Sequence, residues 1–308
     1  MSESDQPIVS FVMPIRNGMP FLDEALRSVF EQTLDDFELI VVDDGSTDAT
    51  PDVLARQRDE RLRVLDGAGA GLVAALTHAL SEARGAYVAR MDADDVSEPQ
   101  RLERQVELLD RNPRVGMVAS WTSIIDADGR ELRREPLPTR HQDLLRRLLL
   151  RNPFAHGSVV LRRAALDEAT GYRVDYGANE DYDLWRRLGR RWELACVPER
   201  LYRYRVHADG VTATDPDRTR LREQLRDEIW SEYAGSLRDI RETVRAGRRY
   251  RDLNERLFRD HLADQRALAR EAWRRRHPLF CARALAAAMA LGSGRYGGRS
   301  WSPSARVA

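Results

Sequence analysis

Short apolar runs alternate with stretches of helical period along the first part of the chain. The segment Pro51–Gln57 has the spacing of one helix face, and Thr50 before it predicts an N-cap, with Pro51 in the first turn. Strands that alternate with helices are typical of an α/β fold with a mostly parallel, Rossmann-like sheet flanked by helices. The predicted strands are Ile8–Met13, Glu38–Val42, Leu62–Leu65, Ala86–Met91 and Val115–Ala119.

The pattern changes towards the C-terminus. Asp126–Gly129 predicts a turn because Asp-Gly is a strong turn dipeptide. Beyond Asp215 the chain becomes almost wholly helical, with long stretches rich in Arg and Glu. We therefore expect a domain over residues 1–214 and a helical, Arg-rich C-terminal extension over 215–308. Between them, His141–Arg151 and Glu180–Arg190 are predicted as helices, and Arg191–Val197 and Leu201–Val206 as strands.

Composition restricts the chemistry. The 308 residues carry 50 basic and 50 acidic side chains, so the formal net charge is zero. Residues 218–308 hold 21 Arg against 11 Asp or Glu, a net charge of +10, which leaves −10 on the part with the acidic motifs. The chain has no lysine, which excludes a P-loop lysine and a Schiff base.

The two cysteines, Cys196 and Cys281, are far apart in the sequence and support neither a disulfide framework nor a zinc site. The N-terminus begins with acidic residues and lacks the pattern of a signal peptide. Together these features predict a cytoplasmic protein.

The first acidic motif follows the run Glu38–Val42. Asp43 and Asp44 end this predicted strand, and Gly45–Asp48 form a turn. Ligands of open α/β sheets bind at the carboxyl ends of the strands, so both carboxylates are placed to accept hydrogen bonds from a base or a ribose. A turn and cap without a ligand explains the same residues about as well.

The second motif is Asp92-Ala93-Asp94-Asp95, at the end of another predicted strand. Residues two apart on a strand point to the same face, so Asp92 and Asp94 are expected to converge. A Mg²⁺ or Mn²⁺ ion that also binds diphosphate oxygens would relieve their repulsion. The alternative is an acidic, solvated loop.

The third motif, Asn179–Trp185, opens a predicted helix with three acids. Acids in a first turn stabilise the helix dipole, which explains Glu180 and Asp183 without a ligand. Asp181 is the better candidate for a general base, because a carboxylate beside a diphosphate and a metal can have a raised pKa suited to accepting a proton from a hydroxyl.

Taken together, these motifs resemble the family-2 inverting glycosyltransferases of GT-A fold, in both order and spacing. The resemblance covers about residues 7–210. The segments that carry it are Pro14–Gly18, Val42–Asp48, Arg90–Asp95 and Glu180–Trp185.

The resemblance implies that an acceptor hydroxyl attacks a nucleoside-diphosphate sugar in a single displacement, with a UDP-sugar favoured as donor and a glycan or lipid-linked acceptor. It implies a Mn²⁺ or Mg²⁺ cofactor that stabilises the charge on the leaving diphosphate. The implied roles are nucleoside binding for Asp43 and Asp44, ribose or sugar binding for Asp92, metal binding for Asp94, and base catalysis for Asp181 with Glu180 beside it; Pro14, Arg16 and Asn17 would form the pocket floor.

Later segments also resemble the family. Pro153–Ser158, which contains His156, is similar to the acceptor-side segment, although an ordinary histidine in a loop is an equally good interpretation. Tyr202–His207 is similar to a late strand in which Arg203 and Arg205 face the diphosphate and His207 binds the metal or a phosphate. The chain departs from the family at Thr77, where Asn is common.

The tail allows several interpretations. The apolar stretch in His277–Gly292 is too short to span a bilayer, which takes about 20 residues. With its arginines it could lie on anionic lipid at the inner face of the plasma membrane, or it could pack on the protein or in a homo-oligomer. Interleaved acids make nucleic-acid binding improbable. A non-catalytic nucleotide-sugar binding or scaffold protein of the same fold is the alternative to an enzyme.

Overall fold

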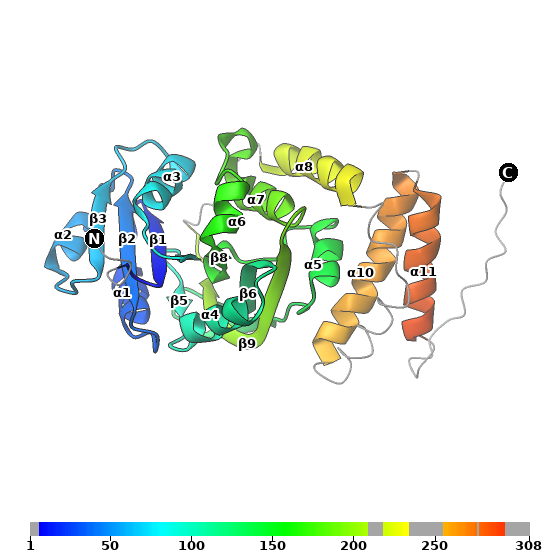
Figure 1. Cartoon of the computed structure of the whole chain (residues 1–308), viewed down its shortest axis with the longest axis horizontal. Coiled ribbons are helices and arrows are strands. Elements are labelled where there is room, and N and C mark those ends of the chain that lie inside the picture. The colour runs from blue at the N-terminus through cyan, green and yellow to red at the C-terminus, as the bar shows by residue number, and fades with distance from the viewer. Residues whose placement is uncertain (1–5, 209–217, 234–254, 276, 293–308) are drawn as a thin grey trace. The chain divides into compact units, whose positions relative to one another are not determined.

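The computed structural model describes residues 6–208, 218–233, 255–275 and 277–292 (Figure 1). Its contacts divide the chain into two compact units, Met1–Tyr233 and Ala234–Ala308. The first unit contains the whole sheet and all three acidic motifs, so it holds the candidate site.

The N-terminal half is a parallel α/β unit. All residues of β1 and all but the last of β2 are buried, since both strands are mainly apolar and their buried polar residues Ser10 and Glu38 bond each other. The strands β1 to β4 pair in the order β3-β2-β1-β4 and are all parallel. Its elements are β1 (Val9–Ile15), α1 (Leu22–Phe30), β2 (Phe37–Asp43), α2 (Thr50–Arg56), β3 (Leu62–Asp66), α3 (Leu72–Glu82) and β4 (Tyr87–Arg90).

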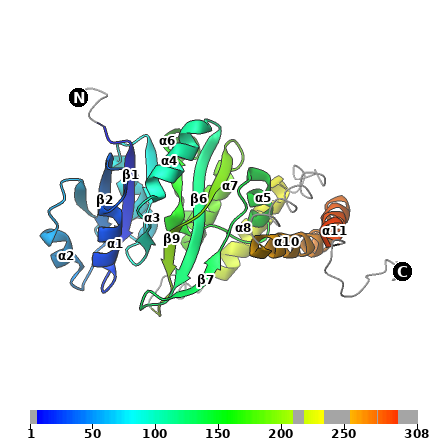
Figure 2. The same cartoon turned by 90° about the horizontal axis from the view of Figure 1, so that it is seen from below.

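The second half of the unit extends this sheet with strands of both directions. β8 inserts antiparallel between β4 and β6. β9 runs parallel beside β6, and Figure 2 labels both strands. The elements are β5 (Val96–Ser97), α4 (Arg101–Arg111), β6 (Val115–Ile125), β7 (Glu131–Glu135), α5 (His141–Leu148), β8 (Val160–Arg162), α6 (Arg163–Glu168), α7 (Glu180–Leu188), β9 (Glu193–Arg205) and α8 (Arg218–Tyr233), with short 3-10 segments at His156–Ser158 and Val174–Asn179. The predicted α/β fold with a Rossmann-like parallel half is confirmed.

Two local predictions are wrong. The two strands expected on either side of Pro198 form one strand, β9. Ser120 of β6 pairs with Val197, and the next residue, Trp121, pairs with Arg200, so Pro198 lies in a β-bulge. Thr50 is not the cap of α2. Asp48 accepts the Thr50 N–H at 2.9 Å, while the Thr50 hydroxyl accepts the Gly18 N–H at 2.8 Å.

The second unit contains a helical hairpin of α10 (Glu255–Arg274) and α11 (Pro278–Gly292), which pack on each other. The helical character predicted beyond Asp215 is confirmed over Arg218–Tyr233 and Glu255–Arg274, and residues 234–254 lie outside the described residues. Within the described parts of the chain, no helix combines the length and the apolar character needed to cross a membrane.

Candidate functional site

The loops after β1 and β2 are joined by Asn17. Asn17 has a positive φ of 56°. Its backbone N–H donates to the Ser46 hydroxyl at 2.8 Å, and its side-chain oxygen accepts the Thr47 N–H at 2.8 Å. Asp43 Oδ1 accepts the Ser46 N–H at 3.0 Å. Pro14 is buried in β1 and Arg16 is exposed beside it. The first acidic motif is therefore a preformed structure rather than a loose turn.

Asp44 is the buried acid of this motif, with 4% of its surface exposed. Its Oδ2 accepts the N–H of Gly71, directly before α3, at 2.9 Å. Its Oδ1 is buried and has no hydrogen-bond partner among the described residues. Because a buried, unpaired acceptor costs about 1–3 kcal/mol, this oxygen is well suited to an N–H or O–H group of a ligand.

Strand alternation does not apply to Asp92 and Asp94, because β4 already ends at Arg90, and their convergence stays a prediction. The buried guanidinium of Arg90 binds Asp92 Oδ1 at 2.5 Å. Asp94 instead lies against His207, with Oδ2 and Nε2 2.9 Å apart. Each carboxylate thus has a partner of its own.

Asp94 and His207 fit a divalent ion that takes few protein ligands. An ion that binds diphosphate needs only one or two protein ligands, because phosphate oxygens and water complete its shell. The Asp94 side chain is 33% exposed and that of His207 16%, so both are accessible. Across the described residues, no three His, Cys, Asp or Glu side chains gather into a complete protein-only site. The pair fits an ion whose other ligands are diphosphate oxygens and water.

Asp95 holds the loop that carries Asp94 against β9. It is 1% exposed and accepts the Tyr202 hydroxyl and the Arg205 N–H, both at 2.7 Å. Burial and the charges of Asp94 and Asp92 raise the pKa of Asp95 well above its usual range. These bonds fix the Asp94 loop to β9.

Arg203 and Arg205, the arginines of β9 that were expected to face the diphosphate, contact protein groups. Arg205 donates from Nε to the Asp94 carbonyl and from Nη2 to Glu24, at 2.7 and 2.6 Å, and stacks on Phe21. Arg203 donates to the Gly129 carbonyl at 2.8 Å. In this arrangement both hold loops around Asp94, and their expected contact with diphosphate stays a prediction.

The third motif begins α7. Asp181 is partly exposed and accepts hydrogen bonds from the Asn152 side chain and from the Tyr182 N–H, both at 2.6 Å. Glu180 is 4% exposed, and its Oε1 lies 3.6 Å from His156 Nδ1. The other nitrogen of His156 is 2.7 Å from the Tyr172 hydroxyl. The more accessible Asp181 is therefore the better candidate to meet a substrate.

Burial, and next the charge of Asp181, raise the pKa of Glu180 to about 8. Folded and unfolded chains then differ in proton binding between about pH 4.5 and 8, and the folded state holds the extra proton. Wild-type stability from this group falls as pH rises, by about 1.4 kcal/mol per unit. Residue 180 does not titrate in Glu180→Gln. From pH 5 to 8 the unfolding free energy of this variant should therefore rise relative to that of the wild type. Denaturant unfolding curves of both proteins at several pH values measure these free energies. A difference in unfolding free energy that does not change with pH would contradict the prediction.

Gly157 is required by close packing against the acidic loop. A Cβ there would lie 1.7 Å from the Tyr202 hydroxyl and 2.9 Å from Asp92 Oδ2. We expect Gly157→Ala to lower the free energy of unfolding by at least about 1–3 kcal/mol, as overpacking does. Gly69→Ala is the control, since nothing lies within 4 Å of its Cβ and only its positive φ opposes the change. Equal losses of unfolding free energy in the two variants would contradict the close packing of Gly157 on Tyr202 and Asp92.

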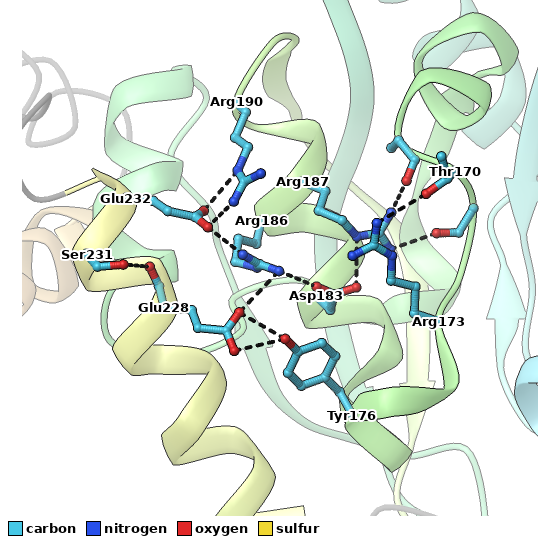
Figure 3. A network of polar contacts seen from close by, with 12 residues as sticks. Thr170, Arg173, Tyr176, Asp183, Arg186, Arg187, Arg190, Glu228, Ser231 and Glu232 are labelled. Atoms are coloured by element: carbon cyan, nitrogen blue, oxygen red, sulfur yellow. Dashed lines mark hydrogen bonds and ion pairs between the residues drawn. The ribbon is translucent and has the colours of Figure 1, made fainter.

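An ionic network fastens α7 to α8 (Figure 3). Asp183 is fully buried and accepts bonds from Arg186 and Arg187 at 2.8 Å. Arg186 also pairs with Glu228 of α8, which accepts the Tyr176 hydroxyl at 2.9 Å. The compact unit therefore runs to Tyr233, beyond the boundary expected at 214, and α8 supports the helix that carries Glu180 and Asp181.

Several residues of this site were not predicted as site residues. Arg90, Tyr172 and Asn152 lie against Asp92, His156 and Asp181. Arg90 is a charged residue at the end of an apolar strand, which signals a buried pairing. The other two carry no such signal, because only the fold brings them close.

The first unit is a mixed α/β sheet with acidic residues at or just after the ends of β2 and β4, and comparison with known proteins names the family. The family model "Glycosyl transferase family 2" matches residues 10–170. The chain belongs to this family and is a glycosyltransferase.

Sequence relatives and solved structures of similar fold include other glycosyltransferases. An uncharacterized glycosyltransferase of Haemophilus influenzae is 30% identical over 67% of this chain and 68% of its own. The O-antigen biosynthesis glycosyltransferase WbnJ of Escherichia coli is 29% identical, over 65% and 80%. S. aureus TarS 1–349 with UDP-GlcNAc is similar in fold, with a TM-score of 0.58, 16% identity and coverage of 93% and 91%. The mannosyltransferase PcManGT of Pyrobaculum calidifontis, with GDP-Man and Mn²⁺, has a TM-score of 0.53, 20% identity and coverage of 94% and 88%.

Proposed function

We propose that this glycosyltransferase moves a sugar from a nucleoside-diphosphate sugar to a hydroxyl of a glycan or lipid-linked acceptor, with a divalent metal ion and with inversion. The observation that carries the proposal is the Asp94–His207 pair, which lies after β4 and β9 and is held by Asp95. The structural neighbours with UDP-GlcNAc and with GDP-Man and Mn²⁺ support it, and so does the relative from O-antigen biosynthesis.

The nucleoside would bind over the first motif. Asp44 offers its unpaired Oδ1 to a donor group of the base or ribose, and Asp43 lies beside it at the end of β2. Asn17 keeps the two loops together. Asp92, fixed by Arg90, would accept from hydroxyls of the ribose or of the sugar.

Transfer requires one proton acceptor. Asp181 would take the proton of the acceptor hydroxyl as its oxygen forms a bond to the anomeric carbon. The bond from that carbon to the diphosphate oxygen breaks on the opposite side, and the nucleoside diphosphate leaves with the electron pair. A Mg²⁺ or Mn²⁺ ion held by Asp94 and His207 would supply Lewis-acid stabilisation of the leaving diphosphate.

A panel of nucleotide sugars tests the proposal by thermal shift. A ligand that binds the folded state raises the melting temperature. We expect at least one nucleotide sugar, with a UDP-sugar favoured, to raise it in the presence of Mn²⁺ and to lose this effect with EDTA. No shift with any donor, or shifts that ignore EDTA, would count against the proposal.

A further inference from the structure

The second unit carries a row of exposed arginines on one side of α10. The exposed side chains that the structure describes in this helix are those of Arg259, Ala263, Arg266, Arg270 and Arg274. The four arginines follow one another at spacings of seven, four and four residues, which keep side chains on one face of an α-helix. At a rise of 1.5 Å per residue the row is about 22 Å long. These four side chains form the arginine face of α10.

The acids of α10 that the structure describes lie away from this face. Asp264 is buried. Asp260 pairs with Arg256 at 3.9 Å, and Glu271 pairs with Arg275 at 2.8 Å, so both acids are engaged by arginines outside the row. The negative charges of the helix therefore do little to neutralise the arginine face.

Most of the arginine face has no partner among the described residues. Arg259, Arg266 and Arg270 form no ion pair or hydrogen bond with them, and Arg274 has only a loose contact with Glu271, at 3.7 Å. Like charges four residues apart on a helix repel each other and destabilise it. A surface of negative charge laid along the row would relieve this repulsion.

The apolar residues of the hairpin are used inside it. α10 and α11 pack on each other, and the buried residues of α11 are Phe280, Cys281, Ala284, Ala287 and Ala288. The apolar stretch that suggested contact with lipid is thus in large part covered, whereas the arginine face is open. Attraction of this unit to a surface would therefore be electrostatic.

The composition of the arginine face favours a flat anionic surface over other partners. A stable protein interface has apolar or aromatic anchors at its centre, and Ala263 is the one other exposed side chain described in α10. Single-stranded nucleic acid is held by aromatic stacking, and the phosphates of a duplex follow a helical path that a straight row meets only at intervals. The headgroup phosphates of a bilayer lie in one plane, which all four arginines can reach together.

We propose that the arginine face of α10 binds this glycosyltransferase to the surface of a bilayer that contains anionic phospholipids. The attraction falls off within a Debye length, about 8 Å at physiological salt, so the arginines lie at the headgroups. This contact goes beyond sugar transfer and uses neither Asp94 nor Asp181. It holds the enzyme at the kind of surface that carries lipid-linked molecules.

Flotation of the full chain with vesicles tests the proposal. Vesicles of phosphatidylcholine alone are compared with vesicles that also contain phosphatidylglycerol, at low and at physiological salt. Arg266→Gln combined with Arg270→Gln removes the two central charges of the row, and glutamine keeps the helix propensity. Arg27→Gln combined with Arg56→Gln is the matched control, because both are exposed arginines on helices of the first unit without an ion pair among the described residues.

We expect the wild type to bind only the vesicles with phosphatidylglycerol, and to bind them less as salt rises. The Arg266/Arg270 variant should bind about tenfold or more weakly, since each arginine near an anionic surface contributes about fivefold, and the control should bind like the wild type. Equal losses in the two variants would overturn the proposal, because net charge alone would then explain binding. Binding to neither kind of vesicle, or equally to both, would overturn it too.

Two further measurements keep the test decisive. If the Arg266/Arg270 variant melts earlier than the wild type, Arg259→Gln, at the other end of the row, replaces it, with an expected loss of about fivefold. A DNA duplex that displaces the protein from the vesicles, and whose binding depends on the same arginines, would show that the face binds nucleic acid and that the membrane assignment is wrong. The vesicles carry neither nucleotide sugar nor acceptor, so failure to bind them leaves the proposed function intact.

Discussion

Asp94→Ala should lower kcat/KM for the nucleotide sugar by about 10²–10³-fold or more, the size of the loss when one group that stabilises developing negative charge is removed. The reason is that Asp94 is the accessible carboxylate paired with His207, while Asp92 and Asp95 are engaged by Arg90, Tyr202 and the Arg205 N–H. Steady-state kinetics over a range of Mn²⁺ concentrations measure the change.

The chain offers a matched control in its second Asp-Ala-Asp sequence, Asp126–Asp128. The Asp128 side chain is 71% exposed and pairs only loosely, at 3.3 Å, with Arg130. Asp128→Ala should keep wild-type kinetics and the wild-type Mn²⁺ dependence. If Asp94→Ala behaves like this control, Asp94 does not bind the metal.

Asp181→Asn should leave nucleotide-sugar binding intact and lower the rate of transfer by about 10²–10⁴-fold, the usual contribution of a general base. The amide keeps the shape of the side chain and its oxygen can still accept the Tyr182 N–H, whereas the bond from the Asn152 amide must rearrange. Thermal shift with the donor measures binding, and single-turnover transfer measures the chemical step.

Asp167→Asn, at an exposed position of α6, is the control for the loss of one carboxylate charge. It should transfer at the wild-type rate. Full transfer by Asp181→Asn would remove this residue from the base role, and loss of donor binding would instead assign it to the donor site.

β1 and β2 of the parallel half could be predicted because their sequences are mainly apolar. β1 and β2 are buried almost throughout, so their sequence contains little else. β8 escaped prediction because three residues show no period. The bulge in β9 escaped it because a proline ordinarily ends a strand, and only the pairing with β6 keeps this strand continuous.

The acids of the site could be predicted by type and place, but their partners could not. Asp95, for example, accepts bonds from the Tyr202 hydroxyl and the Arg205 N–H. These partners lie more than 100 positions away along the chain, so no local pattern links them. The place of Asp92 could not be derived from strand alternation, since β4 ends before it.

The contacts between α7 and α8 could not be predicted from local sequence either. Charges in Arg218–Tyr233 look like those of a solvated helix, yet Glu228 binds the buried Arg186. A helix with few apolar residues can thus belong to the catalytic unit when its charges meet buried partners. Sequence composition alone assigned it to the tail.

The most direct test of glycosyl transfer at this site is a product balance. Nucleoside diphosphate and glycosylated saccharide are quantified from the same reaction, with Mn²⁺ and after EDTA. The account predicts that the two products form in equal amounts with Mn²⁺ and that neither forms after EDTA. Equal formation in the presence and absence of the metal, or no formation of either product with any nucleotide sugar, would contradict it.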